Sequence, residues 1–304
     1  MLSDNYRRLM YTFPRSVYQS DAEFESEFGD PTEWTFLESG GENEVYVTPD
    51  EKHVIKKALE ESSASSNSSN NSTLDGSDSE RLARFEVELM LPLRHANITR
   101  TIAVSPSYTA DLKRTGTLTD HIASHSCPSL RERLRLCKNV SVGLLTVHAH
   151  NVLHLDMKPE NIFMNGRVAT IGDFGSAVPV TANQLGATPG WTPGHISEKR
   201  GKEIDAYSAC FIVIGILAWS ENVLHQCSHL YRLLDATTDI KAHCKVLQGI
   251  FTDTCFFPAN DEGSKLVEVL RALHDGILGR ECGKEELTAW SLINSIEMAV
   301  SAIR

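Results

Sequence analysis

The stretch from residue 154 to residue 175 constrains the rest of the chain most strongly. It reads His-Leu-Asp-Met-Lys-Pro-Glu-Asn-Ile-Phe and, seven residues later, Ile-Gly-Asp-Phe-Gly. The carboxylates of Asp156 and Asp173 are joined there by the amide of Asn161 and the amine of Lys158. The segment is short enough to form a single loop and hairpin, so we expect these four polar groups to lie close together.

This set of groups matches the needs of phosphoryl transfer. One carboxylate must orient a hydroxyl and accept its proton, and a cation must face the phosphate. Two further oxygen ligands must hold Mg²⁺ on the phosphates. The residue types alone therefore favour a magnesium-dependent phosphotransferase.

The spacing resembles the H-R-D-x-K-P-x-N catalytic loop and the D-F-G metal loop of eukaryotic-type protein kinases. The resemblance implies that Asp156 orients and deprotonates the acceptor hydroxyl and that Lys158 neutralises charge on the transferred phosphate. It implies that Asn161 and Asp173 are the ligands of Mg²⁺. The Lys158-Pro159 pair favours a serine/threonine kinase over a tyrosine kinase.

The resemblance also assigns roles to residues around this stretch. His154 and Phe174 are expected to stack in the core and hold the shape of the loop, and Asp205 to accept backbone N–H bonds from it. Thr188 matches the threonine that bonds the catalytic Asp and Lys in serine/threonine kinases. Leu155 stands where many kinases carry an arginine that pairs with phosphate on the activation segment, which predicts activity without phosphorylation of that segment.

The nucleotide-binding residues are expected upstream. Short alternating runs from Trp34 onward predict antiparallel hairpins. The turn after the first run aligns with the kinase glycine loop, although only Gly40 and Val45 match its pattern. Lys56 ends a hydrophobic triplet, as the phosphate-binding lysine of the family does, and Glu86 stands where the family's helix glutamate pairs with that lysine.

These matches predict the fold class and the domains. The class is α+β: a two-lobed protein kinase fold with a small antiparallel-sheet lobe, which carries one helix, and a larger, mainly helical lobe. Residues 34–112 are expected to form the small lobe and residues 113–304 the large lobe. Residues 1–33 are an amino-terminal extension that either packs on the small lobe or trails from it. Within the small lobe, the Ser- and Asn-rich insertion 60–80 is predicted to be disordered, and Ala110 lies near the gatekeeper position that borders the nucleotide base.

Charge and one loop residue bear on the partners. The formal net charge of −11 and the pI near 5.5 argue against nonspecific binding to nucleic acid or to anionic membranes. Glu160 occupies a position that, in kinases of basic substrates, meets an arginine of the substrate. Thr117, where such kinases often carry a second acid, argues the other way. We therefore expect protein substrates with Ser or Thr acceptors and leave their flanking sequence and the oligomeric state open.

Other features place the chain in a reducing compartment. The first residues lack the basic-then-apolar pattern of a signal peptide, and the apolar run 209–219 is too short to span a bilayer. It is interpreted as a buried helix. The seven cysteines are scattered and odd in number, which favours reduced thiols. The expected location is the cytoplasm or the nucleus.

The leading hypothesis is a protein kinase that uses ATP and Mg²⁺ to phosphorylate Ser and Thr side chains. In its small size and its incompletely matched glycine loop, the chain resembles kinases encoded by large DNA viruses such as herpesviruses. The alternative is a pseudokinase scaffold that binds partners without phosphoryl transfer. Two departures from the family pattern motivate this alternative: the incompletely matched glycine loop and a missing glutamate at the end of the activation segment. The five site residues that are retained count against it: Lys56, Glu86, Asp156, Asn161 and Asp173. A small-molecule kinase on the same fold ranks third.

Overall fold

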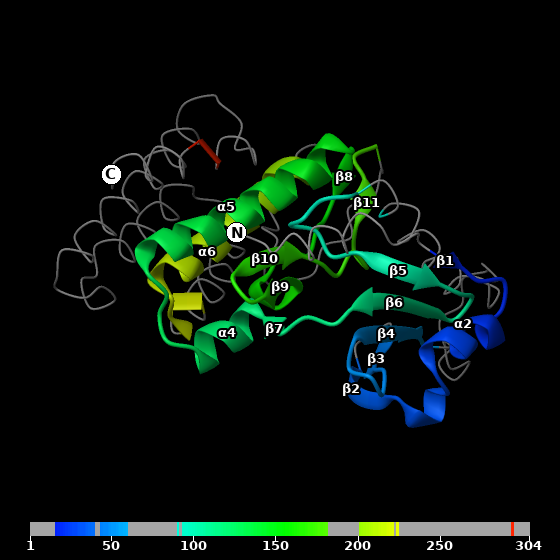
Figure 1. Ribbon diagram of the computed structural model, residues 1–304. Coiled ribbons are helices and arrows are strands. Elements are labelled where there is room, and N and C mark those ends of the chain that lie inside the picture. Colours follow the sequence, from blue (N-terminus) through cyan, green and yellow to red (C-terminus); the bar gives the residue numbers. More distant parts are fainter. Residues whose placement is uncertain are drawn as a thin grey trace, which may run out of the picture. The chain divides into compact units, whose positions relative to one another are not determined.

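The computed structural model describes residues 16–39, 43–59, 90, 93–181, 201–221, 223–224 and 293–294. The chain divides into two compact units, Met1–Lys113 and Arg114–Arg304. The first unit is built on a largely antiparallel sheet and the second carries the long helices, as expected of the α+β kinase class (Figure 1). The insertion 60–80 lies outside the described residues.

Six strands form the sheet of the first unit. In spatial order they are β1 (Ser16–Val17), β5 (Thr101–Val104), β6 (Tyr108–Leu112), β4 (His53–Ala58), β3 (Asn43–Val47) and β2 (Thr35–Ser39). Neighbouring strands run antiparallel except β1 and β5, which are parallel. The hairpins β2–β3 and β3–β4 are the ones that the alternating runs predict.

The strand register separates the two faces of this sheet. Lys56 lies opposite Val45 on β3 and opposite Thr109 on β6, so these three side chains share one face. Ile55 and its partner Ala110 occupy the other face, because successive residues of a strand alternate. The prediction that Ala110 lies near the gatekeeper position is therefore wrong: Ala110 is fully buried on the face opposite Lys56.

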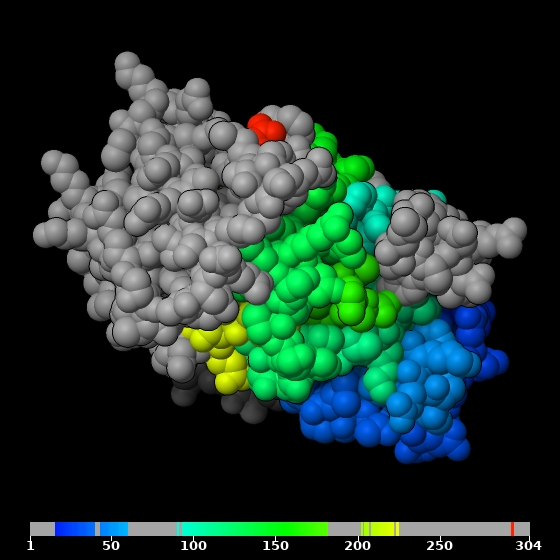
Figure 2. Space-filling model, turned by 60° about the vertical axis from the view of Figure 1, so that its left-hand side comes forward, coloured from blue at the N-terminus to red at the C-terminus, as the bar shows by residue number. Residues whose placement is uncertain are grey.

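Helix α2 (Asp21–Phe28) covers that opposite face. Its Phe24 is fully buried and packs in one cluster with Phe28, Trp34, Ile55 and Tyr108. Phe24 and Phe28 are four residues apart and so lie on the same side of the helix. In the space-filling view, the blue residues of α2 and of strands β2–β4 form one continuous surface (Figure 2). Residues 16–33 thus pack on the small sheet and do not trail from it.

A second set of bonds holds the start of α2 to the sheet. The carboxylate of Asp21 accepts hydrogen bonds from the hydroxyl of Ser105 at 2.6 Å, and from the backbone N–H and the hydroxyl of Ser107 at 3.0 and 2.7 Å. Burial raises the pKa of Asp21, but these hydrogen bonds outweigh burial and leave the pKa below its ordinary value. The carboxylate therefore ties α2 to the β5–β6 turn.

The second unit begins with β7 (Gly116–Thr117) and two helices, α4 (Leu118–Ser124) and α5 (Leu130–Ala149). Thr117 and Ser129 each cap their helix in a reciprocal capping box, with Asp120 and Glu132 as the partners. The chain then forms β8 (Val152–Leu153), the short helix η2 (Pro159–Asn161), β9 (Ile162–Asn165), β10 (Val168–Ile171) and β11 (Val178–Pro179). After 19 residues outside the description comes α6 (Gly201–Ala218).

Helices α5 and α6 pack together as the core of this unit (Figure 1). On α5, the apolar side chains that the helical spacing places on one face are all buried: Leu134, Cys137, Val140, Leu144 and Val147. On α6, every residue from Ile212 to Leu217 whose side chain is larger than hydrogen is buried, as the apolar run 209–219 predicts. In the described parts of the chain, no helix combines the length and the apolar character that crossing a membrane requires.

Candidate active site

The loop between β8 and η2 carries the first two candidate catalytic residues, and a buried carboxylate fixes its start. Both oxygens of Asp205, on α6, accept backbone N–H bonds at 2.8 Å, one from His154 and one from Leu155. Leu155 has a φ of +59°, which turns the chain just before Asp156. The expected structural role of Asp205 is confirmed.

A histidine on α5 completes the support of this carboxylate. Nε2 of His148 lies 2.9 Å from Oδ2 of Asp205, and both side chains are buried. The bond joins α5 and α6 behind the loop. The sequence gives no signal for this pairing, since the two residues are 57 positions apart and share no motif.

His154 connects the catalytic loop to the second motif. The backbone N–H of Asp156 donates to Nδ1 of His154 at 3.3 Å, so the other ring nitrogen, Nε2, donates to the carbonyl of Gly172 at 3.0 Å. The ring of His154 also packs on Phe174, with centroids 4.7 Å apart. Both residues are completely buried, which confirms their expected structural roles.

The two oxygens of Asp156 have different surroundings. Oδ2 accepts a hydrogen bond from Nζ of Lys158 at 2.7 Å and another from Nδ2 of Asn161 at 2.8 Å. Oδ1 is buried and accepts no hydrogen bond from any residue that the structure describes. A buried carboxylate oxygen without a donor is costly, and such atoms persist where a ligand completes them. The loop therefore holds one carboxylate oxygen in a fixed place with no donor from the described residues.

Asn161 and Asp173 flank the same end of the β9–β10 hairpin. The register pairs Ile162 with Ile171, and the N–H of Gly172 donates to the carbonyl of Asn161 at 2.9 Å. Because Nδ2 of Asn161 makes both bonds to Asp156, the amide oxygen is the atom suited to a metal. Asp173 follows with a φ of +59°, which reverses the chain after the strand.

This donor set suits Mg²⁺. An amide oxygen and a carboxylate are hard ligands, and Mg²⁺ is commonly bound by one or two protein oxygens together with substrate phosphates. The described residues include no group of three or more His, Cys, Asp or Glu side chains that could hold a metal without other ligands. The pair Asn161 and Asp173 therefore stays a predicted site for Mg²⁺, whose chemistry suits the metal.

The remaining predicted residues divide into three groups. Glu160 is exposed on η2, where its Oε1 accepts a bond from the hydroxyl of Thr119 on α4 at 3.4 Å. Lys56 and Val45 share a face of the first unit, whereas Lys57 is exposed and lies 3.8 Å from Glu44. The third group lies outside the described residues: Gly40, Glu86 and Thr188.

Leu155 replaces the expected arginine with an apolar contact. Its side chain is 1% exposed and packs with Leu153 of β8 and Ile204 of α6. Val178 of β11, which pairs with β8, packs on the same cluster. The position is therefore part of the core of the second unit.

Comparison with known proteins places this geometry in a family. Residues 39–271 match the family described as Protein kinase domain. Over 154 residues the chain is 26% identical to the LEAF RUST 10 disease-resistance locus receptor-like protein kinase-like 1.2 of Arabidopsis thaliana, covering 44% of this chain and 24% of that protein. Over 129 residues it is 28% identical to the phosphorylase b kinase gamma catalytic chain, liver/testis isoform, of Mus musculus, covering 38% and 32%. The match thus spans a third or less of each relative.

Proposed function

The chain belongs to the protein kinase domain family, and from this premise we propose that it transfers the γ-phosphate of ATP to Ser and Thr hydroxyls of proteins. The observation that carries the proposal is the asymmetry of Asp156. Lys158 and Asn161 hold its Oδ2, while the buried Oδ1 accepts no hydrogen bond from the described part of the chain. In this proposal the hydroxyl of the substrate would donate a hydrogen bond to Oδ1.

In this proposal each residue of the loop has one task. Oδ1 of Asp156 orients the hydroxyl and takes its proton as the bond to phosphorus forms. Lys158, whose side chain is 26% exposed, can contact both Asp156 and a phosphate oxygen at the edge of the loop. Asn161 and Asp173 would hold Mg²⁺, which offsets the negative charge of the phosphates when it is bound.

The first unit would contribute the nucleotide contacts. Lys56 is half-buried on the same sheet face as Val45, and we assign it to the α- and β-phosphates by its place in the family pattern. Glu86 and the glycine loop around Gly40 would support it. The specificity for Ser and Thr rests on Lys158-Pro159 and on Thr188.

Glu160 supports a substrate preference within this function. Its carboxylate is exposed two residues beyond Lys158, and its contact with Thr119 is a long one at 3.4 Å. Such a carboxylate can accept a guanidinium. We propose that basic residues near the acceptor improve a protein substrate.

The test is transfer of radiolabelled phosphate from ATP to a generic basic protein, with Asp156→Ala as the comparison. Loss of the base and of the hydroxyl's orientation should lower kcat by about 10²–10⁴-fold. Asp156→Ala should keep its affinity for Mg²⁺-ATP, which controls for folding of the site. Equal label from both proteins would reject the proposal in favour of the pseudokinase scaffold.

A further inference from the structure

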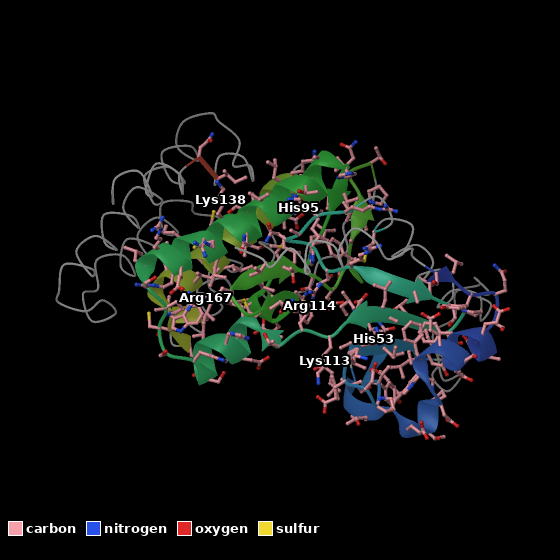
Figure 3. The ribbon with its side chains drawn as sticks, viewed as in Figure 1. His53, His95, Lys113, Arg114, Lys138 and Arg167 are labelled. Carbon is pink, nitrogen blue, oxygen red and sulfur yellow. The ribbon has the colours of Figure 1, made fainter. Side chains whose placement is uncertain are left out.

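Helix α5 exposes a row of basic side chains along its first three turns. Arg131, Arg135 and Lys138 are all exposed, and their spacing of four and three residues places them on one face. Arg167, in the β9–β10 turn, contacts Glu132 of α5, and its side chain is 78% exposed. Figure 3 labels Lys138 on the helix and Arg167 in the turn. We call the four cations, Arg131, Arg135, Lys138 and Arg167, the basic patch.

Two cations of the basic patch lack an acidic partner among the described residues. Arg131 and Arg135 make no ion pair with any described residue. Glu132, the acidic neighbour on α5, is already bonded to Arg167 and to the helix cap Ser129. This concentration of positive charge lies on a chain whose formal net charge is −11.

The row of cations on α5 is unfavourable for the helix itself. Like charges four residues apart on a helix repel each other. Arg131 also lies in the first turn of α5, where the helix dipole is positive and disfavours a cation. Two unfavourable local terms at exposed positions indicate that the cations serve a contact outside the chain.

We propose that the basic patch docks an acidic segment of a protein partner. Arginine presents a planar pair of donors that matches a carboxylate in a bidentate contact. Seven residues of helix span about 10 Å, which three or four residues of extended chain, at about 3.3 Å each, can follow. A short run of Asp and Glu side chains therefore fits the row from Arg131 to Lys138.

The same charges fit other polyanions less well. Nucleic acid and anionic lipid bind through long-range attraction summed over many cations. The net charge of −11 opposes that attraction over the rest of the surface, whereas a short acidic segment meets only the patch. The ligand that fits the basic patch best is therefore a short acidic segment of a protein.

Docking there has a consequence for the candidate active site. Arg167 lies in the turn of the β9–β10 hairpin, and Asn161 and Asp173 flank its other end. A partner held at the turn is held on the unit that carries the catalytic loop. An acidic segment outside the phosphorylation site should thus lower KM and leave kcat unchanged. This kinetic consequence rests on the proposed function, but binding does not.

The binding test uses the full chain and a fluorescein-labelled peptide of six alternating Asp and Glu residues, followed by fluorescence anisotropy. We expect the double variant Arg131→Glu/Arg135→Glu to bind at least tenfold more weakly, and Arg131→Gln/Arg135→Gln to fall between. The matched control reverses two exposed cations of the first unit, Lys52→Glu/Arg94→Glu, and should bind as the unchanged chain does. Circular dichroism melts verify that each variant is folded.

The kinetic test compares two substrate peptides that differ only in an acidic tail. The double reversal on α5 should raise KM about tenfold for the tailed peptide alone, at constant kcat. Equal peptide binding by the reversed and unchanged chains overturns the docking proposal. So does tighter, patch-dependent binding of a single-stranded oligonucleotide or of phosphatidylserine vesicles. If the chain proves inactive, the anisotropy result still decides the docking proposal, because it requires no phosphoryl transfer.

Discussion

At the scale of single residues, the candidate site depends on how hydrogen bonds are shared out around Asp156. The amide of Asn161 donates twice, to the backbone carbonyl and to Oδ2 of Asp156, both at 2.8 Å. Lys158 supplies the third donor. Two of these three bonds hold Oδ2 and the third holds the backbone of Asp156, so the carboxylate is oriented before any substrate arrives.

Replacing the amide tests this arrangement with almost no change of shape. Asn161→Asp removes both donated bonds and places two carboxylates side by side, which then compete for one proton. We expect kcat to fall by about 10²-fold and the acid limb of the pH–rate profile to move to higher pH. Asn139→Asp is the matched control, since the bond that Asn139 makes to the described residues is one that its amide oxygen accepts, from Ala169 N–H. An unshifted profile in Asn161→Asp would contradict the assignment.

A second residue-scale prediction concerns Leu155. Because this position is buried in an apolar cluster and carries no cation, nothing at it can pair with a phosphorylated activation segment. We expect phosphatase-treated protein and Thr181→Ala to keep the phosphorylation rate of untreated protein within about twofold, since a lost charge-assisted pair would change it far more. Loss of activity in Thr181→Ala while the protein stays folded would disprove this prediction.

At the scale of elements, the small sheet depends on α2 and on the carboxylate that anchors it. Asp21→Ala removes three bonds to Ser105 and Ser107 and should destabilise the first unit by about 1–3 kcal/mol at pH 7. The folded-state pKa of Asp21 lies below its ordinary value of 3.8, so its contribution is present above that value and is lost as pH falls below it. Urea titrations at pH 7 and pH 3 should show the difference shrinking in acid. Glu33→Ala, an exposed acid in the same segment, should change little at either pH.

The register of the strands explains why the sequence does not predict which face of the small sheet a given side chain occupies. A slip of one residue moves every side chain to the other face. The β5–β6 pairing contains an irregularity between Thr101 and Ala103, and motif alignment carries no information about such a shift. The face on which Ala110 lies is therefore a property of the pairing, and in the structure Ala110 belongs to the buried cluster that includes Phe24. The eight-residue helix α2 was equally hard to see, because two phenylalanines in so short a segment define no clear period.

At the scale of the whole molecule, the fold class was easier to predict than the contacts that support the catalytic loop. Asp156, Lys158, Asn161 and Asp173 follow from one local motif, and the fold class follows with them. The contact of His148 with Asp205 was not predictable, because it depends on how α5 and α6 pack. The difference between the two oxygens of Asp156 likewise becomes visible only when the donors of the described residues around it are placed.

Separate cores predict a localised response to mutation. Phe24 lies in a cluster built entirely from residues of the first unit. Phe24→Ala should cost about 3–5 kcal/mol there and speed hydrogen exchange in β4, β5 and β6. Amides of α5 and α6 should exchange as before. Faster exchange throughout both helices would show that the two cores do not respond separately.

The carboxylate of Asp205 also sets an order of events during synthesis. The turn at His154 and Leu155 relies on a side chain 51 and 50 positions further along the chain. When the catalytic loop of a nascent chain leaves the ribosome, Asp205, which holds the loop in shape, has not yet emerged. Such a chain should stay incompetent until the later helix emerges and docks, so premature termination before residue 205 should leave only inert fragments.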